Sequence, residues 1–325
     1  MGCTIPRVAD IPRGQIHRSV DGVVLLDKPR GLTSNAALQA VKRLFHARKA
    51  GHTGTLDPLA TGLLPILFGE ATKFAFLLLE SEKAYLARVV LGSTTTTGDA
   101  EGDILERRPV GVAAHDVERA LVRFRGEIEQ LPPMYSALKH RGRPLYEFAR
   151  AGQHVERKPR RVRIEALELV DMNSPFVDIQ VRCSKGTYIR TLAEDIGAVL
   201  GTGGHLGALR RVATGPWRID QAFALARLEV MGEVERAASL QPPEMILGDL
   251  PRITLRTVEV AGFWHGRAAA GQGQGPGRYG VFDSDGGLIG IGEVTTDGQL
   301  HPRRLLRAAE FVQSAQPAEK HRETL

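Results

Sequence analysis

A proline-rich stretch, QPPEMILGDLP at residues 241–251, divides the chain into two parts of different character. Proline removes a backbone donor and interrupts helices and central strands, so such a stretch is typical of a boundary. Beyond it, VFDSDGGLIGIGEV at 281–294 has the pattern of two strands around Asp-Gly-Gly, which predicts a β-hairpin. We therefore predict a large α+β part followed by a small part built of short strands.

The large part carries the periodicities of both strands and helices. Residues 22–29 and 83–92 have the apolar pattern of strands, and apolar residues recur at helical spacing over 34–46, after the N-cap candidates Thr33 and Ser34. The other predicted elements are a polar loop over 93–103, a helix over 115–125, strands over 161–171 and 177–190, a helix over 191–200 and a glycine-rich turn over 201–211.

The charge balance is basic, with 43 Lys and Arg against 37 Asp and Glu and a sequence pI of about 9.5. A surplus of this size also serves solubility, but its distribution in short clusters suits a groove that follows phosphates. The clusters are Lys42, Arg43, Arg48 and Lys49; Lys139, Arg141 and Arg143; Arg157, Lys158, Arg160, Arg161 and Arg163; and the pair Arg210 and Arg211.

Several classes of protein are disfavoured by what the sequence lacks. Its two cysteines, Cys3 and Cys183, have no metal-ligand spacing and form no disulfide framework. The N-terminus has no apolar signal-peptide core, and no apolar run approaches membrane-spanning length. We therefore expect a reduced, cytoplasmic protein that is not bound to a membrane and holds no metal.

The segment GHTGTLDPLATG, at 51–62, places one carboxylate, Asp57, in a loop of small uncharged residues. Pro58 pushes Asp57 toward extended backbone, and glycines on both sides allow sharp turns or close approach. The segment is thus an ordered loop that aims a carboxylate, or an ordinary Asp-Pro turn. The loop alone leaves both interpretations open.

The remaining chemistry points toward nucleic acid. No nucleophile elbow or phosphate-binding loop is present, and the glycines of 201–211 follow a predicted helix, unlike those of a dinucleotide fingerprint. A loop carboxylate, aromatic hydroxyls on strands and basic clusters remain. This combination favours an enzyme that acts on nucleic acid through carboxylate chemistry without a cofactor.

Six motifs, in order, resemble the TruB-type tRNA pseudouridine synthases, of the bacterial stand-alone type. The resemblance covers roughly residues 20–240, and the small C-terminal part resembles the PUA-like RNA-binding domain often attached to them. The motifs are LDKPRGLTS (26–34), GHTGTLDPLATGLL (51–64), KAYLARVVLG (83–92), PPMYSALKHRGRPLYEFAR (132–150), CSKGTYIRTLAEDIG (183–197) and HLGALRRVATGPW (205–217).

The resemblance implies a pseudouridine synthase fold, with a central, mostly antiparallel sheet flanked by helices and a small β-barrel-like PUA domain. We expect a leader over 1–20, a catalytic domain over 21–245, the PUA-like domain over 246–310 and a disordered tail over 311–325.

The activity implied is isomerisation of uridine 55, in the T loop of tRNA, to pseudouridine. Such an enzyme breaks the N1–C1′ bond, rotates the uracil and rejoins it through C5, with no cofactor or metal. The expected partner is tRNA, contacted at its T arm and, through the PUA-like domain, at its acceptor stem. We expect a monomer with no obligatory protein partner, which also assists tRNA folding.

By match to the family's motifs, Asp57 is the catalytic aspartate. Tyr85 matches the tyrosine that stacks on the flipped base and serves as a base at C5, and Arg190 matches the ion-pair partner of the aspartate. The alternative for Tyr85 is an aromatic on a sheet face, and for Arg190 a solvated strand end.

Five further residues are assigned to substrate binding, of which Tyr188, Leu209 and His52 match the family's motifs. Tyr188 frames the pocket with Arg190, Leu209 forms an apolar wall, and His52 helps to fill the space left by the flipped nucleotide. Lys28 shapes the turn beneath the site, and Asp99 lies near the substrate. Plain structural roles compete with these assignments: core packing for Tyr188 and Leu209, and turn or loop capping for His52 and Asp99.

Three other functions compete with this assignment. A non-catalytic tRNA-binding protein or folding chaperone would use the same basic clusters without needing the three catalytic residues together. A guide-RNA-dependent pseudouridine synthase carries a similar PUA-like part, but the compact chain without a long basic extension favours the stand-alone enzyme. A methyltransferase fits less well because no glycine-rich cofactor loop follows a strand.

Overall fold

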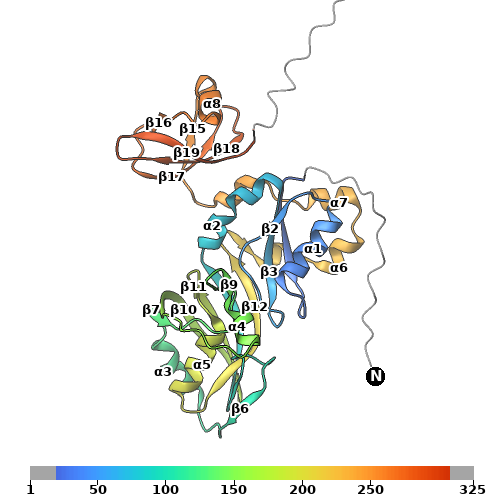
Figure 1. The fold of residues 1–325 in the computed structure, drawn as a ribbon, viewed down its shortest axis with the longest axis vertical. Helices are drawn as coiled ribbons and strands as arrows, with labels where there is room; N and C mark the ends of the chain where they lie inside the picture. The colour runs from blue at the N-terminus through green and yellow to red at the C-terminus, as the bar shows by residue number, and fades with distance from the viewer. Residues whose placement is uncertain (1–19, 308–325) are drawn as a thin grey trace, which may run out of the picture.

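The computed structural model describes residues 20–307, so the predicted leader (apart from Val20) and the predicted tail lie outside the described residues. A large sheet with its helices occupies the middle and one end of the molecule, and a small sheet occupies the other end (Figure 1). The predicted order, a large mixed part followed by a small β part, is confirmed.

Ten strands of the described chain form the large sheet, in the order β14-β1-β3-β12-β4-β11-β10-β7, with β13 paired to β12 and β2 to β3. Only the β1–β14 and β12–β3 pairs are parallel, so the sheet is mostly antiparallel, as predicted. The strands are β1 (Gly22–Lys28), β2 (Ala50–His52), β3 (Thr61–Phe68), β4 (Lys83–Leu91), β7 (Gly126–Gln130), β10 (Arg160–Asn173), β11 (Phe176–Cys183), β12 (Gly204–Thr214), β13 (Trp217–Arg218) and β14 (Phe223–Ala224).

Helices pack on the sheet in two groups. One group, α1 with α6, contacts β1 and β3; the other, α3 with α5, contacts β10, β4 and β12 (Figure 1). The helices and 3-10 turns before residue 251 are α1 (Ser34–Leu44), η1 (Gly69–Phe74), α2 (Ala75–Glu80), α3 (Ala114–Val122), α4 (Leu145–Arg150), α5 (Ile189–Val199), η2 (Ile219–Gln221), α6 (Leu225–Val230), α7 (Glu233–Ala238) and η3 (Pro243–Leu247).

The predicted helix after residue 33 begins where its cap requires. The Thr33 side chain accepts a hydrogen bond from the Ala36 N–H at 3.0 Å, which satisfies one orphan donor of the first turn. Leu38 and Val41 then lie on the buried face of α1. Helical spacing of apolar residues therefore located this helix correctly, apart from its last residues.

The prediction of a glycine-rich turn over 201–211 is wrong beyond Gly203. Residues 204–214 form β12, an interior strand that pairs with both β3 and β4. Glycines here permit close packing of α5 on β12: a Cβ on Gly197 would lie 2.3 Å from a backbone atom of Gly203, and one on Gly204 would lie 3.0 Å from the Ala193 oxygen.

Two smaller corrections concern strand ends. The strand predicted over 177–190 ends at Cys183, and α5 starts at Ile189. The predicted polar loop over 93–103 begins with a short strand, β5 (Ser93–Thr95), which pairs with β6 (Ile104–Arg107). A short hairpin, β8 (Lys139–His140) with β9 (Arg143–Pro144), precedes α4.

The small C-terminal sheet has five strands in the order β15-β17-β18-β19-β16. The predicted hairpin is present, because β17 and β18 are antiparallel neighbours joined by residues 283–287. The elements are β15 (Arg252–Thr254), α8 (Thr257–Trp264), β16 (Ala269–Ala270), β17 (Gly277–Phe282), β18 (Leu288–Val294) and β19 (Gln299–Leu305).

The two sheets share one apolar cluster. Ile246 and Leu247 of η3 and Phe282 of β17 are buried together with residues of the large sheet, among them Leu25 and Trp217. Burial of apolar surface at about 25 cal/mol per Å² makes such a cluster a main source of cohesion between the two parts. The predicted division between residues 245 and 246 falls beside this cluster and remains a prediction.

Candidate active site

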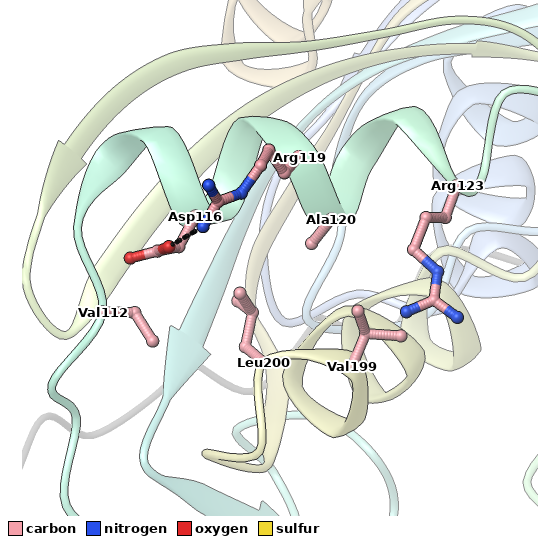
Figure 2. A pocket seen from close by; sticks show the side chains of 7 residues that line it. All are labelled: Val112, Asp116, Arg119, Ala120, Arg123, Val199 and Leu200. Carbon is pink, nitrogen blue, oxygen red and sulfur yellow. Dashed lines mark hydrogen bonds and ion pairs between the residues drawn. The ribbon is translucent and has the colours of Figure 1, made fainter.

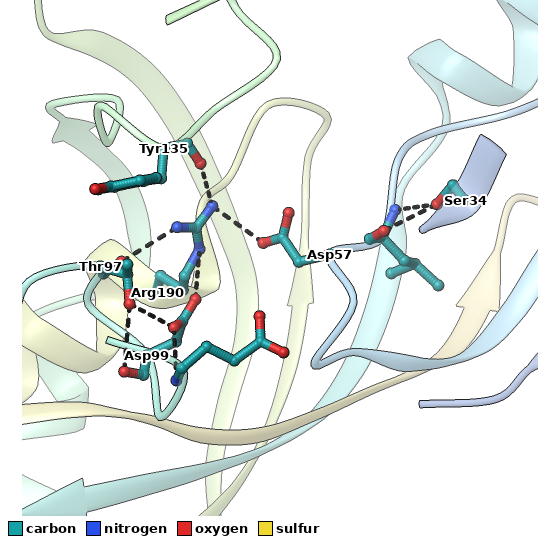
Figure 3. A network of polar contacts seen from close by, with 8 residues as sticks. Ser34, Asp57, Thr97, Asp99, Tyr135 and Arg190 are labelled. Atoms are coloured by element: carbon teal, nitrogen blue, oxygen red, sulfur yellow. Dashed lines mark hydrogen bonds and ion pairs between the residues drawn. The ribbon is translucent and has the colours of Figure 1, made fainter. Parts of the chain in front are cut away.

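Hydrogen bonds to the backbone hold the Asp57 loop on both sides of the aspartate. The Ser34 hydroxyl, at the start of α1, donates to the Leu56 carbonyl at 2.9 Å and accepts from the Leu56 N–H at 2.7 Å (Figure 3). On the other side, the Gly31 N–H donates to the Pro58 carbonyl at 2.8 Å. The loop is therefore ordered, and its carboxylate keeps 43% of its side-chain surface exposed.

Arg190, in the first turn of α5, meets the Asp57 carboxylate. Its Nη2 lies 3.0 Å from Asp57 Oδ2 and donates to the Tyr135 carbonyl at 2.6 Å, and its Nη1 donates to the Thr97 carbonyl at 3.1 Å. Its Nε lies 3.6 Å from Asp99 Oδ2 (Figure 3). The Arg190 side chain is only 7% exposed, so these acceptors replace water around a buried cation.

Asp99 is a buried carboxylate fixed within its own loop. Its Oδ1 accepts from the Thr97 hydroxyl at 2.5 Å and the Glu101 N–H at 3.1 Å, and its backbone carbonyl accepts from the Thr95 hydroxyl at 2.7 Å. Asp99 thus caps its loop and also faces Arg190, whereas its expected place near the substrate stays a prediction.

Burial and the neighbouring charges shift the pKa of Asp57 in opposite directions. Burial raises the pKa of the Asp57 carboxyl, the guanidinium of Arg190 lowers it, Asp99 raises it and Lys28 lowers it, with a net rise. The sequence analysis expected an arginine partner; the structure adds that its attraction does not outweigh desolvation and the second carboxylate. The result is a partly exposed carboxylate that is more basic than an ordinary aspartate.

Tyr85 and Leu209 are brought together by neighbouring strands. In the pairing of β4 with β12, Tyr85 lies opposite Arg211 and Ala87 lies opposite Leu209. The side chains of Tyr85 and Leu209 are half-buried, and each packs against two of the apolar clusters. Burial raises the pKa of Tyr85, and the positive charge of Arg211 opposes this rise.

Tyr188 precedes Arg190 and occupies the N-cap position of α5. Gln130, at the end of β7, holds its backbone on both sides: the Tyr188 N–H donates to Gln130 Oε1 at 3.0 Å, and Gln130 Nε2 donates to the Tyr188 carbonyl at 3.3 Å. The half-buried position of Tyr188 beside Arg190 is therefore fixed by its main chain.

His52 is half-buried and Lys28 is buried. His52 ends β2; its Nδ1 is buried without a hydrogen-bond partner among residues 20–307, and burial lowers its pKa. The Lys28 ammonium is buried and donates to the carbonyls of Pro29, at 3.0 Å, and Leu32, at 2.7 Å. Burial lowers the pKa of Lys28 to about 8, against an opposing pull from Asp57.

Sequence reasoning missed two residues of this region. Ser34 was taken only as a candidate cap, although the LTS motif places it at the foot of the Asp57 loop. Arg211 was grouped with Arg210 as a surface pair, but its side chain is buried and donates to backbone carbonyls. Recognising 204–214 as a strand would have separated the two arginines, because adjacent residues point to opposite faces.

Outside this site, the described part of the chain gives little indication of another ligand site. No group of three or more His, Cys, Asp or Glu side chains is placed there to hold a metal ion. Every helix in residues 20–307 is too short or too polar to cross a bilayer. A shallow hollow of about 430 Å³ lies between α3 and α5, beside the Asp116–Arg119 ion pair, and contains none of the candidate residues (Figure 2).

Three family descriptions match consecutive segments of the chain. Residues 42–189 match the "TruB family pseudouridylate synthase (N terminal domain)" and residues 190–247 the "tRNA pseudouridylate synthase B C-terminal domain". Residues 251–306 match "Pseudouridine synthase II TruB, C-terminal". The matches therefore extend from the second half of α1 to the last strand of the small sheet.

Similar proteins give the same assignment. "tRNA pseudouridine synthase B" of Aromatoleum aromaticum is 50% identical, over 92% of this chain and 97% of its own length, and that of Burkholderia mallei is 52% identical, over 89% and 98%. The solved archaeal box H/ACA sRNP Nop10-Cbf5 complex matches with a TM-score of 0.67 at 25% identity, covering 89% of this chain and 86% of the other. This chain belongs to the TruB family of pseudouridine synthases.

Proposed function

We propose that this chain converts uridine 55, in the T loop of tRNA, to pseudouridine, with Asp57 as the carboxylate that reacts with the substrate. Membership of the family makes the chain an enzyme that isomerises uridine, and relatives half identical to it are named for a tRNA substrate. The observation that carries the residue assignment is a carboxylate that is 43% exposed and held at 3.0 Å by a buried arginine.

The reaction rearranges atoms without adding any. The bond between uracil N1 and ribose C1′ breaks, the base turns, and C5 joins C1′. The proton on C5 leaves and N1 takes up a proton, so product and substrate have the same composition. The chemistry needs no oxidant, reductant or activated donor, and we propose that side chains alone supply it.

Asp57 acts either by attacking the substrate or by removing a ribose proton to give a glycal. Both routes require an ionised carboxylate next to the flipped nucleotide. Arg190 fixes its position, and the raised pKa makes its carboxylate a stronger base than an ordinary aspartate. Asp99 holds Arg190 from the opposite side and is a positioning residue.

Tyr85 is the stacking platform and the base at C5. A uridine must leave its stack before its sugar and C5 become accessible, which costs a few kcal/mol. An aromatic face returns about 1–3 kcal/mol of this by stacking on the base. Leu209, two residues before the strand partner of Tyr85, forms the apolar wall of the same pocket.

The remaining assignments follow their positions around the loop. Tyr188 frames the pocket beside Arg190, and His52 fills the space that the flipped nucleotide leaves in the RNA. Because burial lowers the pKa of His52, its imidazole is neutral at neutral pH and can stack without carrying a charge into the RNA. Lys28 shapes the loop from below through its two carbonyl contacts.

A stand-alone enzyme is favoured over a guide-dependent one. Relatives named tRNA pseudouridine synthase B are about 50% identical, whereas the solved Cbf5 proteins, found in complexes with Nop10 and Gar1, are 25–28% identical. We propose a cytoplasmic monomer with a catalytic domain over 21–245. In this proposal the PUA-like domain, over 246–310, contacts the acceptor stem of tRNA.

The test uses the purified chain alone with an unmodified tRNA transcript, followed by chemical mapping of pseudouridine. A transcript with cytidine at position 55 is the matched control. The expected result is conversion at position 55 in the first transcript and none elsewhere. Tight binding without conversion would favour the chaperone, and conversion only after a guide RNA is added would favour the guide-dependent enzyme; either result overturns the proposal.

A further inference from the structure

Gln130, the last residue of β7, binds both peptide groups that flank the Cα atom of Tyr188. Its Oε1 accepts from the Tyr188 N–H at 3.0 Å, and its Nε2 donates to the Tyr188 carbonyl at 3.3 Å. Gln130 is 2% exposed, so water has little access to these contacts. Because a residue has only two soft backbone dihedrals, holding its N–H and its carbonyl together fixes the direction in which its side chain leaves the backbone.

The start of α5 lacks the usual capping side chain. N-cap positions favour Ser, Thr, Asp or Asn, whose side chains accept from the first turn. In α5 the N-cap residue is Tyr188, and no side chain makes the cap hydrogen bond. A capping box would place Glu or Gln at N3 to accept from the N-cap N–H. Thr191 occupies N3, and its buried hydroxyl has no hydrogen-bond partner within residues 20–307, so Gln130 supplies that acceptor from another element.

The two pocket residues at the start of α5 are held in different ways. Arg190 is fixed through its side chain, which donates to two backbone carbonyls and meets two carboxylates (Figure 3). Tyr188, within the described part of the chain, makes its hydrogen bonds through its backbone. The direction of the Tyr188 ring therefore depends on its main chain, and Gln130 is the side chain that holds this main chain.

Gln130 is itself anchored on both sides. Its main chain pairs with Arg160 of β10, inside the large sheet. Shortly after it, the Pro132 carbonyl accepts from Arg157 Nη1 at 2.8 Å, which fastens the segment that leaves β7. The amide of Gln130 thus extends from a rigid element, and a rigid support is what a side chain needs to hold a neighbour in one position.

Stability alone does not explain a tyrosine at this N-cap. Ser or Asp at position 188 would cap α5 from within the helix, and such a cap typically adds about 1 kcal/mol over a residue without a capping group. Burying a glutamine costs up to about 2 kcal/mol of side-chain conformational freedom. The combination of an uncapped Tyr188 and a buried Gln130 keeps position 188 available for an aromatic ring beside Arg190.

We propose that Gln130 is a positioning residue for the isomerisation: its amide fixes the backbone of Tyr188, and so fixes where the Tyr188 ring stands against the flipped uracil. This rests on the proposed function, in which Tyr188 frames the pocket. Gln130 acts through Tyr188 and contacts no reacting atom. A misplacement of about 1 Å can slow a reaction by about 100-fold, so a lost clamp should slow conversion rather than abolish tRNA binding.

The experiment measures single-turnover conversion of full-length tRNA, together with tRNA affinity. The variants are Gln130→Met, Gln130→Asn, Tyr188→Ala and the Gln130→Met/Tyr188→Ala double variant, each checked for cooperative unfolding in urea. Gln130→Met keeps the length of the side chain without its amide, and we expect conversion to slow by about 10–100-fold with affinity within about threefold. Gln130→Asn keeps the amide but is one methylene too short to reach both groups, so we expect a loss of similar size.

Two further readouts separate positioning of Tyr188 from support of the fold. In the Tyr188→Ala background, Gln130→Met should slow conversion by less than about threefold, because no ring is left to position. Fluorotyrosine incorporated in place of tyrosine gives the second readout by fluorine NMR. We expect Gln130→Met to shift the signal of Tyr188, identified with Tyr188→Phe, and to leave that of Tyr279 in the small sheet unchanged.

Gln180→Met is the matched control. It makes the same substitution at an exposed position of β11. We expect its conversion rate to stay within about twofold of the native rate, with an unchanged fluorine spectrum, because exposed substitutions away from a site have small effects.

The outcomes distinguish a wrong role for Tyr188 from a wrong role for Gln130. If Tyr188→Ala keeps the native rate, the proposed role of Tyr188 is wrong and Gln130 has no ring to position. If Tyr188→Ala is slow but both Gln130 variants are native-like, the inference is overturned. It is also overturned if Gln130→Met is slow with an unmoved Tyr188 signal and a loss that adds to that of Tyr188→Ala. Failure of both Gln130 variants to fold would show that Gln130 serves the fold, and would overturn it as well.

Discussion

Two arginines lie buried in the same site and are balanced in different ways. Arg190 meets two carboxylates, at 3.0 Å and 3.6 Å, and its charge is neutralised locally. Arg211 donates to two backbone carbonyls, and burial lowers its pKa. The difference teaches that two buried cations can be held by different means: one pairs with acids, whereas the other has backbone carbonyls as its acceptors and keeps a cost of burial.

The largest difference in stability is expected when the guanidinium of Arg190 or that of Arg211 is removed. Arg190→Met leaves the buried Asp99 and the carboxylate of Asp57 facing each other unpaired, with an expected stability loss of about 3–5 kcal/mol. Arg211→Met loses its carbonyl contacts but also removes an uncompensated charge, so we expect about 1–3 kcal/mol. Urea unfolding at neutral pH measures the stability lost in each variant, and equal losses would contradict the difference drawn between the two arginines.

The burial of two lysines should appear in the pH dependence of stability. Lys28 and Lys83 have pKa values lowered to about 8 from 10.5, mainly by burial. Above pH 8 the unfolded chain binds more protons than the folded one, so stability rises with pH. We expect a gain of about 1–2 kcal/mol between pH 7.5 and 9.

The comparison of stability stops at pH 9 because Cys183 changes stability with pH in the opposite direction. Its thiol pKa is raised from 9.0 to about 11, so stability falls once the unfolded thiol ionises. The control is Lys83→Met, which should remove part of the gain without touching the catalytic residues. Urea unfolding that shows the same stability at pH 7.5 and pH 9 would contradict the lowered pKa values of Lys28 and Lys83.

The smallest effect is expected at Asp99, whose negative charge is already balanced by Arg190. Asp99 raises the pKa of Asp57, so Asp99→Asn should lower it and move the acid limb of kcat/KM to lower pH, by less than about one pH unit. The amide retains an oxygen for Arg190, which keeps the geometry. Asp103→Asn, an exposed change in the same loop, is the matched control; a shift of the limb to higher pH would reverse the assigned sign.

Periodicity predicted much of the fold, because burial of one face imposes it. The helix after Thr33 and the strand at 83–92 both follow apolar spacing that the structure confirms. β12 was missed because its glycines resemble turn residues, whereas Gly197 and Gly204 serve close packing of a helix on a strand. That function depends on a neighbour 7 residues away in sequence but touching in space, which local pattern does not reveal.

The site was predicted in part, and the limits have a physical cause. Family motifs brought forward Asp57 and Arg190, and Asp99, outside those motifs, was expected near the substrate; these three lie in one network. Arg211 looked like a surface cation because a sequence shows charge but not burial. The sequence also gave no sign that desolvation around Asp57 outweighs its arginine, since that balance depends on the packed surroundings.

The central claim is that Asp57 is the reacting carboxylate, and Asp57→Asn tests it most directly. Pseudouridine formation and tRNA binding are measured side by side in the native chain, in Asp57→Asn and in the exposed control Asp220→Asn. The amide keeps the size of the side chain but can neither attack nor accept a proton, so we expect conversion to fall by about a thousandfold or more, with affinity within a few-fold. Conversion by Asp57→Asn at near the native rate would contradict the account.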